Sequence, residues 1–399
     1  MVKYLIKDIA DGVKLLRLDD DRTRYFEAAW HIPEGVTYNS YLIESSEGQM
    51  LIDTWKGQYS ELFMKAIKEI TDISKIKYVI INHAEPDHTG SLPVLLREAK
   101  DAKVVVNVAG IKLLKAKYDI KNEIVSIEGT KEVKLLGEDF IFIHVPWVHW
   151  PETMLSYQKR TKILYTCDVF GSFSIPSSYR ADPRDSFYLK SAEKYFITVM
   201  GYYRKYVLNA IEKVKSMNLE ILKIAPSHGG IWDRNVEEPM QLFEKWAKGE
   251  PEKNKVTIAY VSMYGSVEEA VSRVYNELAS KDINVKTFAI NDSDYPDFED
   301  FLTEINSSSV VLLATPTYDT SVHPRMKALL ELIKDKFRGV SKPFVVMVSY
   351  GWGSNAIKYM ENSLKDAGLE AILMETFREK ISDEQVKKIT SVIKDKIKT

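Results

Sequence analysis

Four side chains that can bind a metal lie within six consecutive residues of this sequence. They follow the apolar run 78–81, which is typical of a short buried strand, so they lie on the loop at its carboxyl end. A loop this short cannot direct all four to solvent or all four to the core. A multivalent cation is the simplest group that satisfies them together, the alternative being a solvated acidic loop. The four residues are His83, Glu85, Asp87 and His88.

A second candidate region follows the predicted strand 140–145. His144 lies inside this strand, where a packed and hydrogen-bonded side chain is the expected role. His149 lies beyond the strand end, among prolines and tryptophans, where a ligand would project. We therefore take His149, and not His144, as a ligand.

Two more strands end in the same way. The run 162–167 is followed by Asp168, for which a turn-capping role is the alternative, and the run 221–226 is followed by Ser227 and His228. His31, His144 and His323 are left out of the ligand set. The predicted ligands are therefore His83, Glu85, Asp87, His88, His149, Asp168 and His228.

The spacing H-x-E-x-D-H resembles the metallo-β-lactamase signature H-x-H-x-D-H, with Glu85 in place of the middle histidine. Zinc hydrolases favour imidazole-rich sites, whereas a carboxylate among histidines suits non-haem iron. The chain thus resembles the A-type flavodiiron proteins over its whole length. The resemblance implies one iron bound by His83, Glu85 and His149, a second bound by Asp87, His88 and His228, and Asp168 as a bridge.

Two further residues enter through the same resemblance. Asp53, at the end of the predicted strand 50–53, is a candidate support for the metal loop. Tyr195 belongs to a tyrosine-rich predicted helix, 192–207, for which core packing is the ordinary interpretation, and the resemblance places Tyr195 near the metal pocket. The aromatic segment 25–35 is expected to serve packing. No catalytic residue beyond the metal ligands is implied.

The elements that must position these groups fall into two domains, 1–250 and 254–399, separated by a polar stretch with Gly249 and Pro251. The first opens with short, antiparallel-type strands. The second alternates buried strands and helical stripes, which predicts a doubly wound parallel sheet of flavodoxin size. Its expected strands are 256–261, 285–290, 310–314, 344–348 and 371–374, and its expected helices are 268–280, 298–306, 324–336 and 355–366. With the resemblance, the fold class is α/β and α+β: a metallo-β-lactamase-like αββα sandwich followed by a flavodoxin-like domain.

Ligands of doubly wound sheets bind beyond the carboxyl ends of the strands. Three loops at that edge are suited to phosphate and an isoalloxazine ring, and they resemble the FMN site of flavodoxins and flavodiiron proteins. Val267 stands where flavodoxins usually have a threonine, and a flavodoxin-like fold without flavin is the alternative. The loops contain Ser262, Met263, Tyr264, Gly265, Ser266, Val267, then Thr315, Pro316, Thr317, Tyr318, Asp319, then Ser349, Tyr350, Gly351, Trp352, Gly353.

The composition of the chain limits the classes of partner that are expected. The 55 basic and 57 acidic side chains give a net charge of −2 and are dispersed, so neither nucleic acid nor an anionic membrane is expected. No apolar run approaches the ~18 residues that span a bilayer, and the start lacks a signal-peptide pattern, so a cytoplasmic protein is expected. The single cysteine, Cys167, excludes a disulfide framework and a fused rubredoxin domain, so the electron donor is a separate molecule.

The function that the resemblance implies is reduction of dioxygen to water, of nitric oxide to nitrous oxide, or of both, with electrons that pass through FMN to a di-iron site. The donor is rubredoxin, a flavin reductase or a reduced deazaflavin coenzyme, and the assembly is a head-to-tail homodimer or a dimer of dimers. Two rivals remain open: a zinc hydrolase fused to a flavodoxin module, and a non-enzymatic flavin electron carrier. The sequence does not distinguish the two gases.

Overall fold

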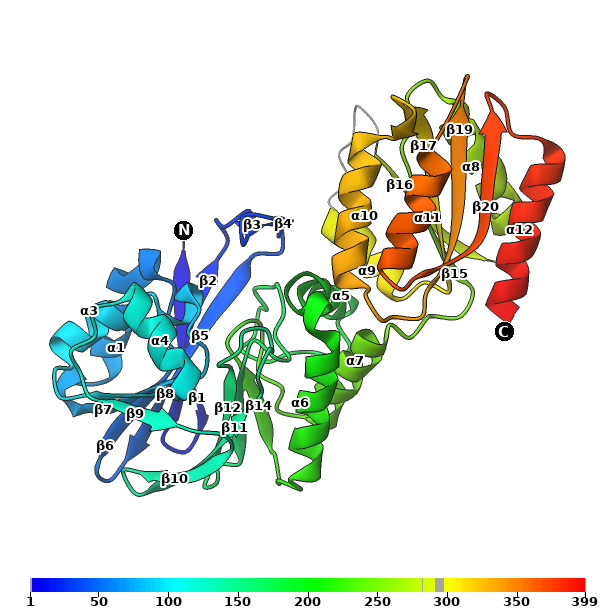
Figure 1. The fold of residues 1–399 in the computed structure, drawn as a ribbon. Helices are drawn as coiled ribbons and strands as arrows, with labels where there is room; N and C mark the ends of the chain where they lie inside the picture. Colours follow the sequence, from blue (N-terminus) through cyan, green and yellow to red (C-terminus); the bar gives the residue numbers. More distant parts are fainter. Residues whose placement is uncertain (1, 282, 291–297, 399) are drawn as a thin grey trace. The chain divides into compact units, whose positions relative to one another are not determined.

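The computed structural model describes residues 2–281, 283–290 and 298–398 (Figure 1). The chain divides into two compact units, Met1–Glu244 and Lys245–Thr399. This division falls within helix α7 (Glu237–Lys248), slightly before the boundary near residue 250 that the sequence predicts. Among the described residues, no helix combines the length and apolarity needed to cross a membrane.

The first unit contains two sheets. The larger sheet is antiparallel from β1 to β6 and parallel from β6 to β9, so the antiparallel opening predicted from the sequence is confirmed. Its parallel strands are joined through helices α1 (Ser60–Ile70), α3 (Leu92–Glu98) and α4 (Val108–Lys117). The strands, in sheet order, are β1 (Lys3–Ala10), β2 (Val13–Asp20), β5 (Val36–Ser45), β6 (Gly48–Ile52), β7 (Ile76–Ile81), β8 (Lys103–Asn107) and β9 (Ile124–Ile127).

The smaller sheet packs face to face against the larger one. One cluster of buried apolar side chains, which includes Leu15 and Ile80 from the first sheet and Phe140 and Tyr165 from the second, fills the space between them. The strands of the smaller sheet are β10 (Lys131–Leu135), β11 (Glu138–His144), β12 (Met154–Gln158), β13 (Ile163–Cys167) and β14 (Lys223–Pro226). With helices outside both sheets, the predicted αββα sandwich is confirmed (Figure 1).

Two short segments of the first unit differ in secondary structure from what the sequence predicts. The aromatic segment 25–35 forms a small hairpin of β3 (Tyr25–Phe26) and β4 (Trp30–His31). The predicted helix 192–207 is interrupted: α5 (Ser186–Tyr195) continues into a π-helical turn, Phe196–Met200, and a tight 3₁₀ turn, Gly201–Tyr203, before α6 (Arg204–Ser216). Such π turns inside helices occur frequently at functional sites.

The second unit is a parallel sheet with the strand order β16-β15-β17-β19-β20. Relative to the chain this order is 2-1-3-4-5, the flavodoxin arrangement, so the predicted doubly wound sheet is confirmed. The short strand β18 (Ser321–Val322) pairs with the end of β17. The five parallel strands are β15 (Lys255–Tyr260), β16 (Asn284–Ala289), β17 (Val310–Tyr318), β19 (Pro343–Tyr350) and β20 (Glu370–Arg378).

Helices cover both faces of this sheet. Helix α8 (Ser266–Ala279) packs with the terminal helix α12 (Asp383–Lys398), which the sequence analysis did not predict, over the cluster that contains Ile258 and Leu312. The remaining helices are α9 (Phe298–Asn306), α10 (Pro324–Lys336) and α11 (Ala356–Asp366) (Figure 1). The loops that precede α8 and follow β17 and β19 therefore meet at one edge, where a ligand pocket is expected.

Candidate metal centre and flavin pocket

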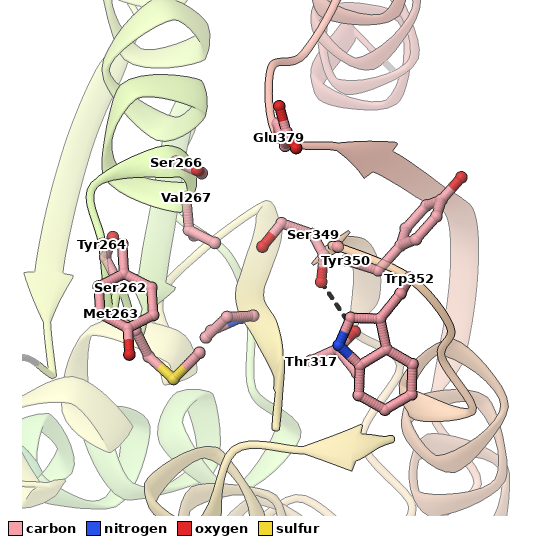
Figure 2. Close-up of a pocket in the computed structure, with 12 residues that line it drawn as sticks. Ser262, Met263, Tyr264, Ser266, Val267, Thr317, Ser349, Tyr350, Trp352 and Glu379 are labelled. Carbon is pink, nitrogen blue, oxygen red and sulfur yellow. Dashed lines mark hydrogen bonds between the residues drawn. The ribbon is translucent and has the colours of Figure 1, made fainter. Parts of the chain in front are cut away.

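A pocket of about 280 Å³ lies at the carboxyl edge of the parallel sheet of the second unit (Figure 2). Eleven of the sixteen predicted flavin-loop residues line it: Ser262, Met263, Tyr264, Ser266, Val267, Pro316, Thr317, Ser349, Tyr350, Gly351 and Trp352. Among the described residues, the lining does not include the other predicted residues, Gly265, Thr315, Tyr318, Asp319 and Gly353. One lining residue was missed from the sequence, Glu379, which follows β20.

One predicted loop is largely a strand. Thr315 and Pro316 belong to β17 through pairing with β19, and Thr317 and Tyr318 extend that strand by pairing with β18. Thr315 is fully buried, whereas the hydroxyl of Thr317 donates a hydrogen bond to the carbonyl of Ser349 at 2.8 Å, and its oxygen lies 2.7 Å from Ser354 Oγ. The end of β17 and the end of β19, which both line the pocket, are therefore joined to each other by a hydrogen bond.

Residues 262–264 form another side of the pocket and lead through Gly265 into the amino end of α8. Gly265 adopts a left-handed φ of +89°, which favours glycine, and α8 begins at the next residue. Ser262 Oγ accepts a hydrogen bond from the amide of Glu268 at 3.3 Å. Within the described part of the chain no lysine or arginine lines the pocket, so an anionic ligand would be held by amides, hydroxyls and the helix end.

Two aromatic side chains flank this pocket. Tyr264 and Trp352 lie on opposite sides of it in Figure 2 and are 93% and 81% exposed. A flat ring system that enters between them would stack on at least one aromatic face and cover surface that is otherwise in contact with water. The residues present therefore fit a flavin mononucleotide: amides at a helix end for its phosphate and aromatic faces for its ring.

The candidate metal centre lies in the first unit, where the loop after β7 is held in place by its neighbours. Asp53 Oδ1 accepts a hydrogen bond from the amide of Asn82 at 2.8 Å. Pro86 begins the short helix α2 (Pro86–Thr89), and Thr89 Oγ1 donates back to the carbonyl of Glu85 at 2.8 Å. This turn directs the side chains before and within α2 toward a common point.

A close backbone contact fixes the end of the same loop. A Cβ added at Gly90 would lie only 2.2 Å from the amide nitrogen of Gly57, so glycine is required there. The carbonyl of His88 accepts hydrogen bonds from the amide and hydroxyl of Thr54 at 2.7 and 2.8 Å. The loop is therefore rigidly packed against the segment that follows β6.

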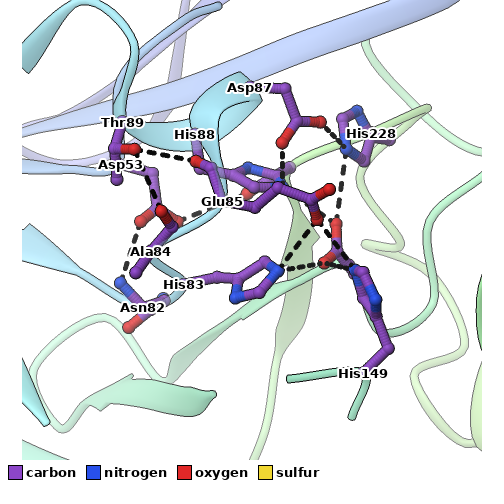
Figure 3. Close-up of polar contacts among 12 residues, drawn as sticks. Asp53, Asn82, His83, Ala84, Glu85, Asp87, His88, Thr89, His149 and His228 are labelled. Carbon is purple, nitrogen blue, oxygen red and sulfur yellow. Dashed lines mark hydrogen bonds and ion pairs between the residues drawn. The ribbon is translucent and has the colours of Figure 1, made fainter. Parts of the chain in front are cut away.

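The remaining candidate ligands come from the smaller sheet. Strands β13 and β14 are parallel, and Cys167 is in register with Pro226, so Asp168 and His228 leave neighbouring strand ends. His149 lies on the connection between β11 and β12. The structure brings all seven predicted residues together at the carboxyl ends of β7, β13 and β14, and Figure 3 labels all of them except Asp168.

One half of the cluster consists of His83, Glu85 and His149. Glu85 Oε2 lies 3.1 Å from His83 Nε2 and 3.0 Å from His149 Nε2. The side chains of both histidines are nearly fully buried, and that of Glu85 is 17% exposed. The two Nε2 atoms and one carboxylate thus face the same small volume.

The other half consists of Asp87, His88 and His228. Asp87 Oδ1 lies 3.4 Å from His88 Nε2, and Asp87 Oδ2 lies 3.3 Å from His228 Nε2. His228 Nδ1 is 2.7 Å from the carbonyl of Thr37, which fixes its proton on Nδ1 and leaves Nε2 free.

Asp168 stands between the two halves. Its Oδ1 lies 3.0 Å from His88 Nε2 and 3.3 Å from His228 Nε2. Its Oδ2 lies 3.5 Å from His83 Nε2 and 3.4 Å from His149 Nε2. Each oxygen therefore faces one half, the arrangement that a bridging carboxylate needs.

Several polar atoms of the centre are buried without a well-aligned hydrogen bond. Within the described part of the chain, both carboxylate oxygens of Asp87, Oδ2 of Asp168, and Nε2 of His88 and of His228 make ion-pair contacts within the cluster but no hydrogen bond that meets the usual geometry. Burying charged groups with so few hydrogen bonds is costly. A mixed set of imidazoles and carboxylates around two adjacent positions satisfies two cations and suits iron.

The charges within the cluster shift its pKa values strongly. Burial alone would raise the pKa of Glu85, but hydrogen bonds from His149 and His83 outweigh it and hold that pKa far below its usual range. Burial would lower the pKa of His149, but Asp168 and Glu85 raise it to about 9. Asp168 and Asp87 likewise outweigh burial and raise the pKa of His228 to about 10. Without metal, these side chains form charged pairs, and a metal must displace their protons.

The histidines left out of the ligand set have other contacts. His144 Nε2 is 3.2 Å from the carbonyl of Pro151, and His323 caps α10 by accepting from the amide of Arg325 at 3.3 Å. The ring of His31 lies 5.3 Å from that of Tyr25 in the small hairpin.

Side chains around the cluster add contacts that the sequence only partly predicted. Tyr195, fully buried at the end of α5, donates a hydrogen bond to Asp168 Oδ1 at 3.0 Å. Glu152 was missed: its Oε1 lies 2.7 Å from His83 Nδ1. Its position shortly after His149 was the only indication in the sequence. No periodic pattern distinguishes Glu152 from a surface glutamate.

Two family models match this chain, one in each of its two units. Residues 36–229 match the family described as ODP family beta lactamase, and residues 258–389 match the flavodoxin family. The chain is 30% identical to a nitric oxide reductase of Moorella thermoacetica over 91% of this chain and 90% of that protein. It is 29% identical to a type A flavoprotein of Rhodobacter capsulatus, over 90% of this chain and 82% of that protein. A variant flavo di-iron protein from Thermotoga maritima superposes with a TM-score of 0.94, at 34% identity, over 100% of this chain and 99% of that one.

Proposed function

The chain belongs to the flavodiiron protein family, and we propose that it is an oxidoreductase that receives electrons on FMN and uses them at a di-iron site to reduce dioxygen to water, nitric oxide to nitrous oxide, or both. The observation that carries this proposal is the buried cluster in which Glu85 lies between His83 and His149, at 3.1 and 3.0 Å. The Moorella relative, named a nitric oxide reductase, supports the nitric oxide activity.

In this proposal His83, Glu85 and His149 hold one iron and Asp87, His88 and His228 hold the other, with Asp168 between them. When bound, the two irons supply one-electron redox chemistry and positive charge for the oxygen atoms of a small substrate. The buried atoms of Asp87, His88 and His228 support this assignment, because within the described residues they face one another in ion pairs without a well-aligned hydrogen bond.

The surrounding side chains restrict what can reach the centre. The rings of Phe26, Tyr38 and Tyr195 lie 5.9, 5.5 and 5.7 Å from the ring of His228. This aromatic wall excludes water from one side of the cluster, and Tyr195 orients the bridging carboxylate through its hydrogen bond to Asp168. A site so lined suits small, uncharged substrates, as dioxygen and nitric oxide are.

Neither rival function explains the cluster as well. A zinc hydrolase would favour an imidazole at the position of Glu85 and an accessible water site. A flavin carrier with an unused first domain would have no reason to bury histidines and carboxylates against one another, since burying charged groups is costly unless a bound cation offsets it.

We propose that the electrons come from a donor outside residues 1–399. These residues contain a single cysteine, Cys167, which is buried, so they do not supply the four thiolates of a rubredoxin iron site. Rubredoxin, a flavin reductase and a reduced deazaflavin coenzyme are the candidate donors. Each would be tested by the rate at which it reduces bound flavin without oxygen.

We propose a head-to-tail homodimer, alone or paired as a dimer of dimers, in which each electron path crosses between chains. Exposed aromatic side chains near both cofactor regions support an interface there: Trp147 and Tyr202 in the first unit, and Tyr264 and Trp352 in the second. Such a pairing is closed and two-fold. Both regions would then be covered in the assembly.

The dimer is tested by complementation. A chain with His83→Asn and His149→Asn is mixed, under conditions that exchange subunits, with a chain carrying Gly265→Val, which disrupts the flavin loop. Mixed dimers should recover donor-dependent turnover although each parent is inactive. Complete exchange without recovery would place the path within one chain.

The activity itself is tested by steady-state rates of dioxygen and nitric oxide consumption with one reduced donor, in the protein loaded with iron and FMN. The Asp168→Ala variant is the control. Donor-dependent consumption of at least one gas that this variant lacks is expected. Equal rates in both proteins, at the level of free flavin, would refute the proposal.

A further inference from the structure

A buried glutamate lies directly behind one of the candidate metal ligands. Glu152, on the connection between β11 and β12, is 1% exposed. Its Oε1 lies 2.7 Å from His83 Nδ1 and also accepts a hydrogen bond from the amide of Ala84 at 2.8 Å. One carboxylate oxygen therefore contacts both the ring of His83 and the backbone that follows it.

We infer that Glu152 is the positioning residue for His83. A carboxylate at Nδ1 accepts the ring proton there, which leaves Nε2 unprotonated and directed at the metal position. This assignment matters because His83 Nε2 is the atom that lies near Glu85 and Asp168, at 3.1 and 3.5 Å. A histidine with its proton on Nε2 would place a donor where a metal must bind.

The packing around Glu152 supports this role. A Cβ at Gly110, in α4, would lie 3.2 Å from Glu152 Cγ, so the side chain is closely confined on that face. The alternative partner for the ring is Thr153, whose Oγ1 is 3.5 Å from His83 Nδ1 and already donates to the carbonyl of Trp150 at 3.1 Å. Glu152 is therefore the shorter and better-fixed contact.

The two halves of the centre differ in this respect. The equivalent nitrogen of His228 lies 2.7 Å from a neutral carbonyl, that of Thr37, whereas His83 faces a carboxylate. A carboxylate partner makes an imidazole a more basic ligand than a carbonyl does. The orientation of His83 therefore depends on one replaceable side chain, and that of His228 depends on the backbone.

This inference rests on the proposed metal centre, so its test uses cobalt(II) as the probe and does not require gas reduction. Metal-free, FMN-loaded full-length protein is titrated with cobalt, and the two binding steps are followed by the visible absorption of the ion. The exchangeable ring N–H signal of His83 is followed by paramagnetic NMR. The variants are Glu152→Gln and Glu152→Ala. The control is Glu138→Gln, which changes another buried glutamate, 2.6 Å from Arg160 Nε.

The expected result is a loss confined to one of the two cobalt sites. Its affinity should fall by about 10- to 100-fold in Glu152→Ala and by less in Glu152→Gln, because the amide oxygen still accepts a hydrogen bond. The ring N–H signal should shift in Glu152→Gln and disappear in Glu152→Ala. The second site and the control should match the unmodified protein.

Three outcomes would overturn the inference. Unchanged affinities and an unchanged signal would show that Glu152 does not position His83. An equal loss at both sites with earlier thermal unfolding would show general loosening instead. If Glu152→Ala does not fold, Glu152→Gln decides the matter, and an unshifted signal in it contradicts the inference. Failure of both cobalt sites to form in the unmodified protein would instead refute the proposed metal centre.

Discussion

The two cofactor regions of this chain are built in opposite ways. In the metal centre the ligands leave rigid strand ends, and His83, His88 and His228 are essentially fully buried. In the flavin pocket the flanking Tyr264 and Trp352 are 93% and 81% exposed. The first region is closed around its ligand atoms, and the second is an open edge.

This difference concerns what each region requires in order to be stable. The metal centre buries polar atoms that have no hydrogen-bond partner within the described residues, so a bound cation contributes to folding. Among the described residues that line the flavin pocket, none has a buried side-chain polar atom without a hydrogen-bond partner. We therefore expect metal loss to destabilise the first unit more than flavin loss destabilises the second.

The largest effect is expected from Asp168→Ala. Asp168 faces four histidine nitrogens, and its removal leaves both halves without their shared carboxylate. Both metals should be lost and gas reduction should fall to background, while FMN stays bound. Metal analysis and the flavin spectrum test this, with Asp139→Ala, a partly exposed aspartate on β11, as the matched control. Retention of two metals would remove Asp168 from the ligand set.

The next effect is a change of metal. Glu85→His makes the ligand set imidazole-rich, which favours zinc. Protein produced with both metals present should contain more zinc than iron, lose gas reduction and keep its flavin. Normal iron content with normal turnover would show that Glu85 does not select the metal.

A smaller, graded effect is expected from pH. Because Asp168 with Glu85 raises the pKa of His149 to about 9, and Asp168 with Asp87 raises that of His228 to about 10, both rings bind protons at neutral pH in the metal-free protein despite their burial. Metal uptake releases these protons, so affinity should fall about tenfold per pH unit for each proton displaced as pH decreases. Cobalt titrations between about pH 6 and about pH 8 measure this slope. A pH-independent affinity would contradict the pairing of these histidines with carboxylates.

The smallest effect concerns the flavin. Trp352→Ala removes one aromatic face, and stacking of this kind is worth about 0.5–1.5 kcal/mol, so FMN affinity should weaken by up to about tenfold. Metal content should not change. Flavin fluorescence titration gives the dissociation constant, and Tyr275→Ala, which removes an exposed aromatic side chain of α8 outside the pocket lining, is the matched control. Unchanged affinity would mean that the ring does not stack on Trp352.

The sequence predicted the parts of each site that are local in the chain. Apolar runs that end in polar residues indicated β7, β13 and β14, and the polar residues after them are the ones that the structure brings together. Parallel strands place their carboxyl ends at one edge, so neighbouring runs converge there without further information.

What the sequence did not predict depends on contacts between distant segments. Glu152 meets His83 across 69 positions, and only the packing of the two sheets brings them together. Thr317 and Tyr318 extend β17 because β18 pairs with them, and β18 is too short to produce a sequence pattern. Glu379, which lines the flavin pocket, follows β20, and no periodic pattern in the sequence indicates that it does so.

The central claim is that the closed region holds iron and the open region holds FMN. Protein produced with iron and zinc both available, and purified without added cofactor, would be analysed for both metals and for flavin. The account predicts about two irons and about one FMN per chain. Stoichiometric zinc in place of iron, together with hydrolase activity, would contradict it.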